Sequence, residues 1–443
     1  MVFAAPGAYD RPYAALSAAR GAFLDRIRLS TLWMVGASGG FVMVEPAPYE
    51  FLFMLAVIVF VATGLTLRAG HLPLMFLLIF YNIGFIIALI PVIDFPGTAK
   101  WTAVSCYLSV TTLFFAMALV EDTARRIEIL MRGYIFGAVV TSGIAVLGYF
   151  ELIPGWETFI GALRARSTFK DPNVFGPFLI LPALILLQRI MFGGRRGLLG
   201  NSVLALIIAA GLFLSFSRGA WGHFGASALL MLYLTYVTTR SGAERMRIVI
   251  AVLLGAILIT TFIVALLSLD QVYNLFEERA SLMQNYDAGH TGRFGRHILG
   301  AMMILDYPFG IGPLQFSKYL SEDPHNSFLL SFTAGGWLGG ASFLALVLVT
   351  LWIGLRHVFI RAPWQATLIA VYAVFVGEVG ESYFIDVQHW RHYYLIIGVV
   401  WGLVLAMRPP VGPAMRAGRD RAMLNADASA RSGRITRARS LTL

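Results

Sequence analysis

The chain has 443 residues, of which 58% are hydrophobic and only 13% are charged, and its mean hydropathy is +0.74. Charged residues make up about a quarter of an ordinary soluble domain, so this composition excludes a soluble globular protein. The formal net charge of +10 does not indicate a nucleic-acid partner, because the basic residues gather beside apolar runs, where they attract anionic membrane lipids.

Twelve apolar runs predict an all-α fold, a polytopic bundle of membrane helices. A helix needs roughly 20 mostly apolar residues to cross a bilayer. The runs are rich in Leu, Ile, Val, Ala and Phe without alternation, which is not the pattern of membrane β-strands. The expected spans are 29–44, 50–67, 72–93, 101–120, 129–150, 173–192, 198–216, 219–237, 248–268, 326–355, 364–382 and 391–407.

The basic residues predict that both termini lie in the cytoplasm. Lys and Arg are enriched in cytoplasmic loops, and this orientation places 24 of the 34 basic residues inside. No cleavable signal is expected, because the first long apolar run leads into further spans. The expected parts are a cytoplasmic segment (1–28), nine spans (29–268), a large outer loop (269–325), three spans (326–407) and a disordered basic cytoplasmic tail (408–443).

The chain carries no motif for a metal or a nucleotide. Cys106 is the only cysteine and lies within a span, and no Cys/His cluster has the spacing of a zinc site. There is no Gly-rich phosphate loop and no soluble domain large enough to bind ATP. We therefore expect no cofactor and no ATP, and any reaction must draw its energy from the substrate or from an ion gradient.

Two long loops are expected on the outer face of the membrane, one at 151–172 and one at 269–325. Long ordered loops on a membrane scaffold usually have a function. The second loop contains amphipathic and Gly/Pro-rich stretches, which predict interfacial helices and tight turns. Its expected elements are helices at 270–285 and 295–306, a turn at 287–292 and a tight loop at 308–313.

A histidine lies at the mouth of the tenth expected span. The sequence Asp-Pro-His-Asn-Ser at 323–327 leads directly into this apolar helix. Histidine takes or gives a proton near neutral pH, so His325 is a candidate catalytic base that activates an acceptor hydroxyl. Asn326 is a candidate supporting residue. The alternative is that these polar side chains merely cap the helix.

Arg218 lies in a hairpin, 215–219, that joins two expected spans with almost no loop. An arginine at the membrane surface is costly unless it is paired. The planar guanidinium suits a phosphate or a carboxylate, so Arg218 is a candidate clamp for an anionic substrate. The alternative is a snorkelling membrane anchor.

A second basic group precedes the span at 173–192. Arg164, Arg166 and Lys170 come just before Asp171, which opens this helix. Basic side chains beside a helix N-terminus form an anion site, so these residues are candidates for binding a pyrophosphate, with Asp171 in support. The alternative is an ordinary run of solvated loop charges.

A third basic pair lies in the large outer loop. Arg293 and Arg296 are three residues apart, on one side of an expected helix. They can bind an anion together, or they can simply pair with Glu277, Glu278 or Asp306.

Two acids, Glu378 and Glu381, lie near the outer end of the eleventh expected span. A magnesium site would use one or two carboxylates together with phosphate. Arginines already supply the positive charge that a metal would bring, so we expect these acids to orient arginines and expect no metal.

A histidine base near several arginines on the outer face predicts a reaction on an anionic, lipid-linked substrate. Pyrophosphate is the natural candidate because it is a good leaving group and no ATP is available outside the cell. Arginines would stabilise its departing charge in place of a metal. The residues therefore predict a glycosyl transfer at the outer leaflet.

Four segments in the middle of the chain match the motifs of a known family in order. They are Ser-Thr-Phe-Lys-Asp-Pro-Asn-Val-Phe-Gly at 167–176, Ser-Phe-Ser-Arg-Gly-Ala-Trp at 215–221, Gly-Arg-Phe-Gly-Arg at 292–296 with Asp-Tyr-Pro-Phe-Gly-Ile-Gly-Pro at 306–313, and Pro-His-Asn-Ser at 324–327 with Gly336 and Gly339. On these residues the chain resembles the O-antigen ligase and O-antigen polymerase family of bacterial inner-membrane proteins.

The resemblance implies a twelve-helix bundle with its active site in the periplasm. It also implies a glycan linked to undecaprenyl pyrophosphate as donor, and no required metal. The functional residues of the family correspond to Arg218, Arg293 and His325. The family commonly has tryptophan four residues after the loop arginine, where this chain has His297.

The resemblance leaves two acceptors open. A ligase passes the glycan to lipid A-core, whereas a polymerase passes it to another lipid-linked glycan. We favour the ligase, because the pattern His-Asn, nine residues, Gly-x-x-Gly is most similar to that branch. A flippase or transporter for the same lipid is a further alternative, but it would place charges along the middle of the spans. The sugar, its linkage and the oligomeric state do not follow from the sequence.

Overall fold

The computed structural model describes residues 10–280, 292–320 and 322–407. Two compact units are distinguished, residues 1–405 and residues 406–443, and the description below concerns the first. The predicted tail at 408–443, most of the predicted turn at 287–292 and the end of the predicted helix at 270–285 lie outside the described residues.

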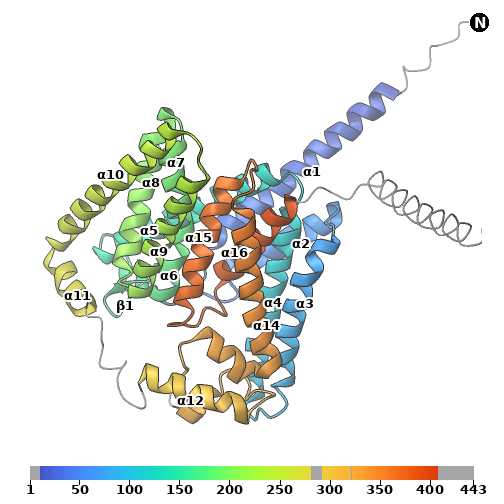
Figure 1. Ribbon diagram of the computed structural model, residues 1–443, viewed down its shortest axis with the longest axis vertical. Helices are drawn as coiled ribbons and strands as arrows, with labels where there is room; N and C mark the ends of the chain where they lie inside the picture. Colours follow the sequence, from blue (N-terminus) through green and yellow to red (C-terminus); the bar gives the residue numbers. More distant parts are fainter. Residues whose placement is uncertain (1–9, 281–291, 321, 408–443) are drawn as a thin grey trace, which may run out of the picture. The chain divides into compact units, whose positions relative to one another are not determined.

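The described chain is almost entirely helical, as predicted (Figure 1). Each expected span overlaps one helix or, for 173–192, two, and α14, which overlaps 326–355, is kinked. The bundle consists of α1 (Asp10–Ser38), α2 (Pro48–Thr63), α3 (Leu72–Ile87), α4 (Phe95–Ala118), α5 (Thr123–Tyr149), α6 (Pro172–Phe178), α7 (Ile180–Phe192), α8 (Arg195–Leu214), α9 (Arg218–Thr238), α10 (Gly242–Leu267), α14 (Ser327–His357), α15 (Gln365–Glu381) and α16 (Arg391–Ala406).

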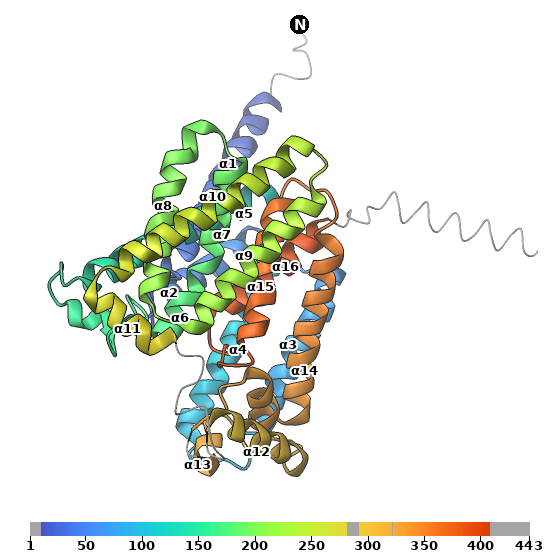
Figure 2. The same cartoon turned by 60° about the vertical axis from the view of Figure 1, so that its left-hand side comes forward.

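Short elements make up the two long loops. The first loop contains a two-stranded hairpin, and the second contains helices at the two predicted places and one more, α13 (Figure 2). The bounds of these elements are η2 (Trp156–Phe159), β1 (Ile160–Gly161), β2 (Arg164–Ala165), α11 (Asp270–Ala280), α12 (Arg293–Asp306) and α13 (Phe316–Leu320); a further short turn, η1 (Ala69–His71), precedes α3.

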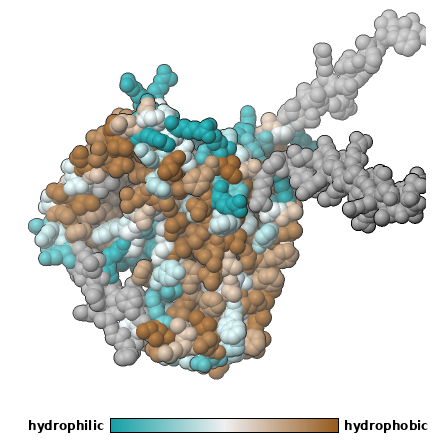
Figure 3. Space-filling view, viewed as in Figure 1, coloured by the Kyte–Doolittle hydropathy of each residue, from teal (hydrophilic) through white to brown (hydrophobic). Residues whose placement is uncertain are grey.

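Seven of the described helices are long and apolar enough to cross a membrane. Large hydrophobic side chains such as Phe51, Met54 and Ile58 of α2 are exposed, and Figure 3 shows hydrophobic residues over much of one face. Exposed apolar area of this extent is typical of a surface that faces lipid. The chain is therefore a polytopic membrane protein with about seven candidate spans, whereas twelve were expected. Helices α2 and α16 have only 16 residues each.

The sixth expected span begins with a broken helix. Asp171 caps α6, and its carboxylate accepts a hydrogen bond of 2.7 Å from the backbone N–H of Asn173. Pro177 lies inside α6 and has no N–H to donate, so the helix ends at Phe178 and α7 begins at Ile180.

Helix α14 folds back on itself at Gly336. This residue has φ +67° and ψ −170°, a left-handed conformation that glycine adopts without a steric penalty. The rings of Phe328 and Phe343 lie 5.5 Å apart, although fifteen residues of straight helix would separate them by about 22 Å. The expectation of one continuous span over 326–355 is therefore wrong at its start, because residues 327–335 form a separate short helix.

Small residues allow α3 to pack closely against α14, and α5 against α1. A Cβ atom at Gly84 of α3 would lie 2.4 Å from the backbone nitrogen of Gly339 in α14. A Cβ atom at Gly133 of α5 would lie 2.1 Å from the carbonyl oxygen of Trp33 in α1. Such contacts between backbones stabilise helix pairs in membranes. Helix α15 packs against both α9 and α14, so its end lies between the starts of those two helices.

Candidate functional site

The loop after α15 holds the start of α14. The backbone N–H of Ser327 donates to the carbonyl of Ser382 at 2.8 Å. Its hydroxyl donates to the carbonyl of Ile385 at 3.0 Å and accepts from the N–H of Val387 at 2.8 Å. These hydrogen bonds fix the backbone two residues after His325 against the loop at 382–390.

His325 itself sits in a left-handed backbone conformation, with φ +48°. Asn326 follows it and caps α14, since its side-chain oxygen accepts from the N–H of Leu329 at 3.0 Å. The His325 side chain is 40% exposed, and its Nδ1 lies 3.7 Å from a carboxylate oxygen of Asp386, which is 24% exposed. A carboxylate on the Nδ1 side favours the tautomer whose Nε2 accepts a proton.

Helix α12 holds the segment that leads to His325. The buried Arg296 forms an ion pair with Glu322, which keeps the pKa of this carboxyl below its usual range. Nε2 of His297 donates to the carbonyl of Pro324 at 2.7 Å. Burial raises the pKa of the Asp323 carboxyl in the same segment. Arg296 and His297, which are neighbours in α12, thus hold Glu322 and Pro324 of this segment.

The turn between α8 and α9 presents Arg218 as the first residue of α9. Ser217 caps this helix, with its hydroxyl 3.4 Å from the N–H of Ala220. Arg164 reaches the same turn: its Nε donates to the carbonyl of Ser215 at 2.9 Å, and a terminal nitrogen donates to the side-chain oxygen of Asn173 at 2.7 Å. Arg164 and Arg218 therefore lie near the N-termini of α6 and α9, which favour an anion.

The end of α15 contacts both the turn that holds Arg218 and the start of α14, which follows His325. A Cβ atom at Gly219 would lie 2.7 Å from a carboxylate oxygen of Glu381. The next residue, Ser382, accepts the hydrogen bond from Ser327. The neighbours of Arg218 and of His325 thus contact two consecutive residues, so both side chains belong to the same end of the bundle although they are far apart in the sequence.

The other predicted anion-binding residues lie elsewhere or serve other contacts. Nε of Arg166 donates to the carbonyl of Thr158 at 3.2 Å, within its own loop. Lys170 forms an ion pair of 2.7 Å with Glu45. The backbone of Arg293 begins α12, but the position of its side chain is outside what the structure describes. Its role stays a prediction.

Glu378 and Glu381 contact histidines. Nδ1 of His223 lies 2.8 Å from Glu381, and Nε2 of His392 lies 3.4 Å from Glu378, all four side chains being buried. These histidine contacts were not expected from the sequence, and the role of the two acids in orienting arginines stays a prediction. Within the described ranges, no group of three or more His, Cys, Asp and Glu side chains has the arrangement of a metal site.

Sequence reasoning missed two residues of this site. Asp386 lies 61 positions from its partner His325, in a short loop without a motif, and no local pattern marks it. His297 was noted only as a departure from the family pattern, whereas its bond to Pro324 shows that it helps to hold the loop of His325. A histidine next to an arginine on an amphipathic helix was the available signal.

The chain is thus a helical membrane protein with a half-exposed histidine and arginines at one end of its bundle. Residues 203–344, about a third of the chain, match the family model described as O-antigen ligase. This part of the chain is thus similar to the O-antigen ligase family, which agrees with the resemblance seen in the sequence motifs. No curated protein matches the chain.

Proposed function

We propose that the protein is a glycosyltransferase of the bacterial inner membrane, an O-antigen ligase that moves a glycan from undecaprenyl pyrophosphate to lipid A-core at the periplasmic face. The main support for this proposal is that His325 and Arg218 lie at the same end of the bundle. Their neighbours Ser327 and Gly219 contact Ser382 and Glu381 respectively. A proton acceptor and a cationic group at the same end of the bundle are the groups that transfer from a pyrophosphate donor requires.

The reaction is a single displacement at the anomeric carbon of the donor. Nε2 of His325 takes the proton of the acceptor hydroxyl, and the oxygen forms a bond to the anomeric carbon. The bond from this carbon to the pyrophosphate oxygen breaks, and undecaprenyl pyrophosphate leaves with the electron pair. Asp386 stabilises the imidazolium that forms, because its carboxylate faces Nδ1 at 3.7 Å.

Arginines stabilise the departing pyrophosphate. Arg218 and Arg293 hold it, with Arg164 beside Arg218 at the N-termini of α6 and α9. Fixed cations at the place where negative charge develops lower the barrier without a metal. Arg296 was predicted to bind the anion together with Arg293. Because Arg296 pairs with Glu322, it instead positions the loop of His325.

The membrane orientation is part of the proposal. With the twelve helices at the expected positions as spans and both termini in the cytoplasm, the loop of His325 faces the periplasm. The excess of Lys and Arg in the opposite loops supports this orientation. The shorter helices α2 and α16 would then cross a locally thinned membrane or only part of it.

A reconstitution with defined substrates tests this function. The purified protein receives a glycan linked to undecaprenyl pyrophosphate, with lipid A-core or with no other acceptor, and the product size is measured. A ligase adds the glycan to lipid A-core. A ladder of longer lipid-linked glycans without lipid A-core would instead identify a polymerase. An unchanged donor under both conditions would contradict glycan transfer, and only then would a transporter of this lipid be the better description.

A further inference from the structure

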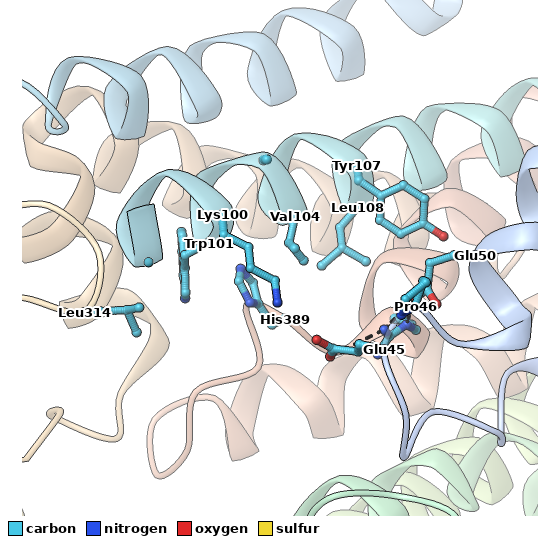
Figure 4. A pocket seen from close by; sticks show the side chains of 13 residues that line it. Glu45, Pro46, Glu50, Lys100, Trp101, Val104, Tyr107, Leu108, Leu314 and His389 are labelled. Carbon is cyan, nitrogen blue, oxygen red and sulfur yellow. Dashed lines mark hydrogen bonds and ion pairs between the residues drawn. The ribbon is translucent and has the colours of Figure 1, made fainter. Parts of the chain in front are cut away.

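A cavity of about 530 Å³ lies between α2, α4 and the loop at 382–390. Most of its wall comes from outside the stretch that matches the family model, with Leu314 as the exception. Gly97, Lys100 and Ala103 of α4 line it and are exposed, so the cavity is open along this side of the helix. Its deeper wall is apolar, with Val104 and Leu108 (Figure 4).

Charges of both signs surround the mouth. Nε of Arg391 donates to Glu50 at 2.6 Å, and a terminal nitrogen of the same arginine lies 3.8 Å from Glu45. A hydrogen bond from Lys170 lowers the pKa of the Glu45 carboxyl, so Glu45 remains a carboxylate at neutral pH. The side chain of Lys100 points into the cavity (Figure 4) and forms no salt bridge within the described part of the chain.

A neutral aromatic ring forms one wall. The rings of His389 and Trp101 stack with their centroids 4.1 Å apart and their planes at 29°. His389 lies beside Trp101 and lines the cavity together with it (Figure 4). Its Nε2 is buried and has no hydrogen-bond partner among the residues described. Burial and the nearby Arg391 lower the pKa of His389 to about 4, so the ring is neutral at physiological pH.

The cavity is close to the proposed reaction centre. His389 is three residues after Asp386, the partner of His325. Because consecutive Cα atoms are 3.8 Å apart, the Cα atoms of Asp386 and His389 are separated by at most about 11 Å. The loop at 382–390 thus contributes one residue to the proposed site and another to the cavity.

The chemistry of the walls favours a saccharide. Arg391 and Lys170 already pair with the two carboxylates at the mouth, so these cations offer little net positive charge to a pyrophosphate. Sugar hydroxyls donate to carboxylates and to an unpaired ring nitrogen and accept from an ammonium group. An apolar wall with a few placed polar groups is the usual form of a small-molecule site. The exposed Phe51 and Met54 of neighbouring α2 give an attached lipid an apolar surface.

We propose that this cavity binds the saccharide part of the acceptor, so that its reacting hydroxyl reaches His325 across the loop at 382–390. The proposal rests on the proposed function and adds to it the place of the second substrate. Lys100 and the carboxylates of Glu45 and Glu50 contact the sugar hydroxyls. The neutral ring of His389 contacts an apolar face of a sugar and accepts a hydrogen bond through Nε2.

Kinetics with Lys100→Ala and His389→Phe test this assignment. The first change removes an exposed ammonium group, and the second keeps the stacked ring but removes its nitrogens. Each should raise the KM for the acceptor about tenfold, the effect of one lost hydrogen bond to a charged or buried group. The KM for the donor and kcat should change less than about threefold. Lys318→Ala is the matched control, because Lys318 is an exposed lysine in the large loop and does not line this cavity.

A binding measurement separates this proposal from the proposed function. The His325→Ala protein in nanodiscs is titrated with deacylated lipid A-core oligosaccharide, and heat is recorded. Binding that the Lys100→Ala/His389→Phe double change weakens at least tenfold supports the cavity, even if the wild-type protein transfers nothing. Equal binding by the double variant, the absence of binding to the parent protein, or a rise in the donor KM alone would overturn the assignment. Loss of transfer with binding intact would count only against the proposed function.

Discussion

Two histidine–carboxylate pairs lie close together in this protein and differ in their surroundings. His223 and Glu381 are 2.8 Å apart, and their side chains are 0% and 3% exposed. His325 and Asp386 are 3.7 Å apart, and their side chains are 40% and 24% exposed. The same two chemical groups therefore form a closed contact between α9 and α15 in one case and an accessible pair on a loop in the other.

The difference indicates which pair does chemistry. Nε2 of His223 is already bonded to the carbonyl of Val374 at 3.0 Å, so both ring nitrogens are used inside the bundle. A general base needs a ring nitrogen that a substrate can reach. The His325 side chain is 40% exposed, so a substrate can approach it, whereas His223 joins two helices and thereby holds Glu381 beside Gly219.

The largest expected effect is that of His325→Ala. Loss of a general base lowers the rate of transfer by about 10²-fold or more. The protein should still be produced in the membrane and keep its melting temperature, because the exposed ring contributes little to packing. The assay is glycan transfer with saturating substrates. Near wild-type turnover would show that His325 only precedes a helix cap.

Arg218→Lys and Arg293→Lys keep the charge but remove the planar guanidinium. We expect each change to reduce donor binding and kcat/KM by about tenfold, because an ammonium group cannot hold a pyrophosphate through two parallel hydrogen bonds. Arg166→Lys is the control, since Arg166 bonds within its own loop. If both lysine variants had full activity, these arginines would act as membrane anchors or as simple point charges.

Two isosteric changes compare the histidine pairs directly. Glu381→Gln should destabilise the fold by about 1–3 kcal/mol, because it disturbs a buried hydrogen bond, and should lower the melting temperature in nanodiscs. Asp386→Asn should leave the melting temperature nearly unchanged but lower kcat by about tenfold, since the imidazolium loses its counter-charge. If Glu381→Gln lowered only kcat and Asp386→Asn lowered only the melting temperature, the roles given to the two pairs would be wrong.

The smallest effect concerns the pH dependence of stability. The folded-state pKa of His389, about 4, lies below its ordinary value of 6.5. As pH falls below 6.5, the unfolded chain takes up this proton first, so the contribution of His389 to stability is lost between pH 6.5 and 4. Melting temperatures of the wild type should fall more steeply over this range than those of His389→Phe. Parallel curves would show that the ring is not enclosed.

The positions of the helices and caps could be predicted from the sequence. Apolar runs of sufficient length set the helices, and Asp171 and Asn326 are ordinary capping residues. The tight hairpin at 215–219 is also confirmed, since α8 ends at Leu214 and α9 begins at Arg218. Such features depend on neighbours within a few residues, which a sequence shows directly.

Features that depend on distant partners were not predictable. The apolar run through Gly336 continues without interruption, so hydropathy gives no sign that α14 folds back there. Arg296 was expected to bind an anion, and only the packing of α12 against α14 shows that Glu322 occupies it. The pairing of His325 with Asp386 likewise depends on how α15 packs between α9 and α14.

The stoichiometry of transfer without metal tests the mechanism proposed for His325 and the arginines. Purified protein is incubated with excess EDTA, undecaprenyl-pyrophosphate-linked glycan and lipid A-core, and the released undecaprenyl pyrophosphate and the extended acceptor are both quantified. A histidine base and arginine clamps predict full activity, with one undecaprenyl pyrophosphate released for each glycan transferred. Loss of transfer in EDTA that magnesium or manganese restores would contradict this metal-free mechanism.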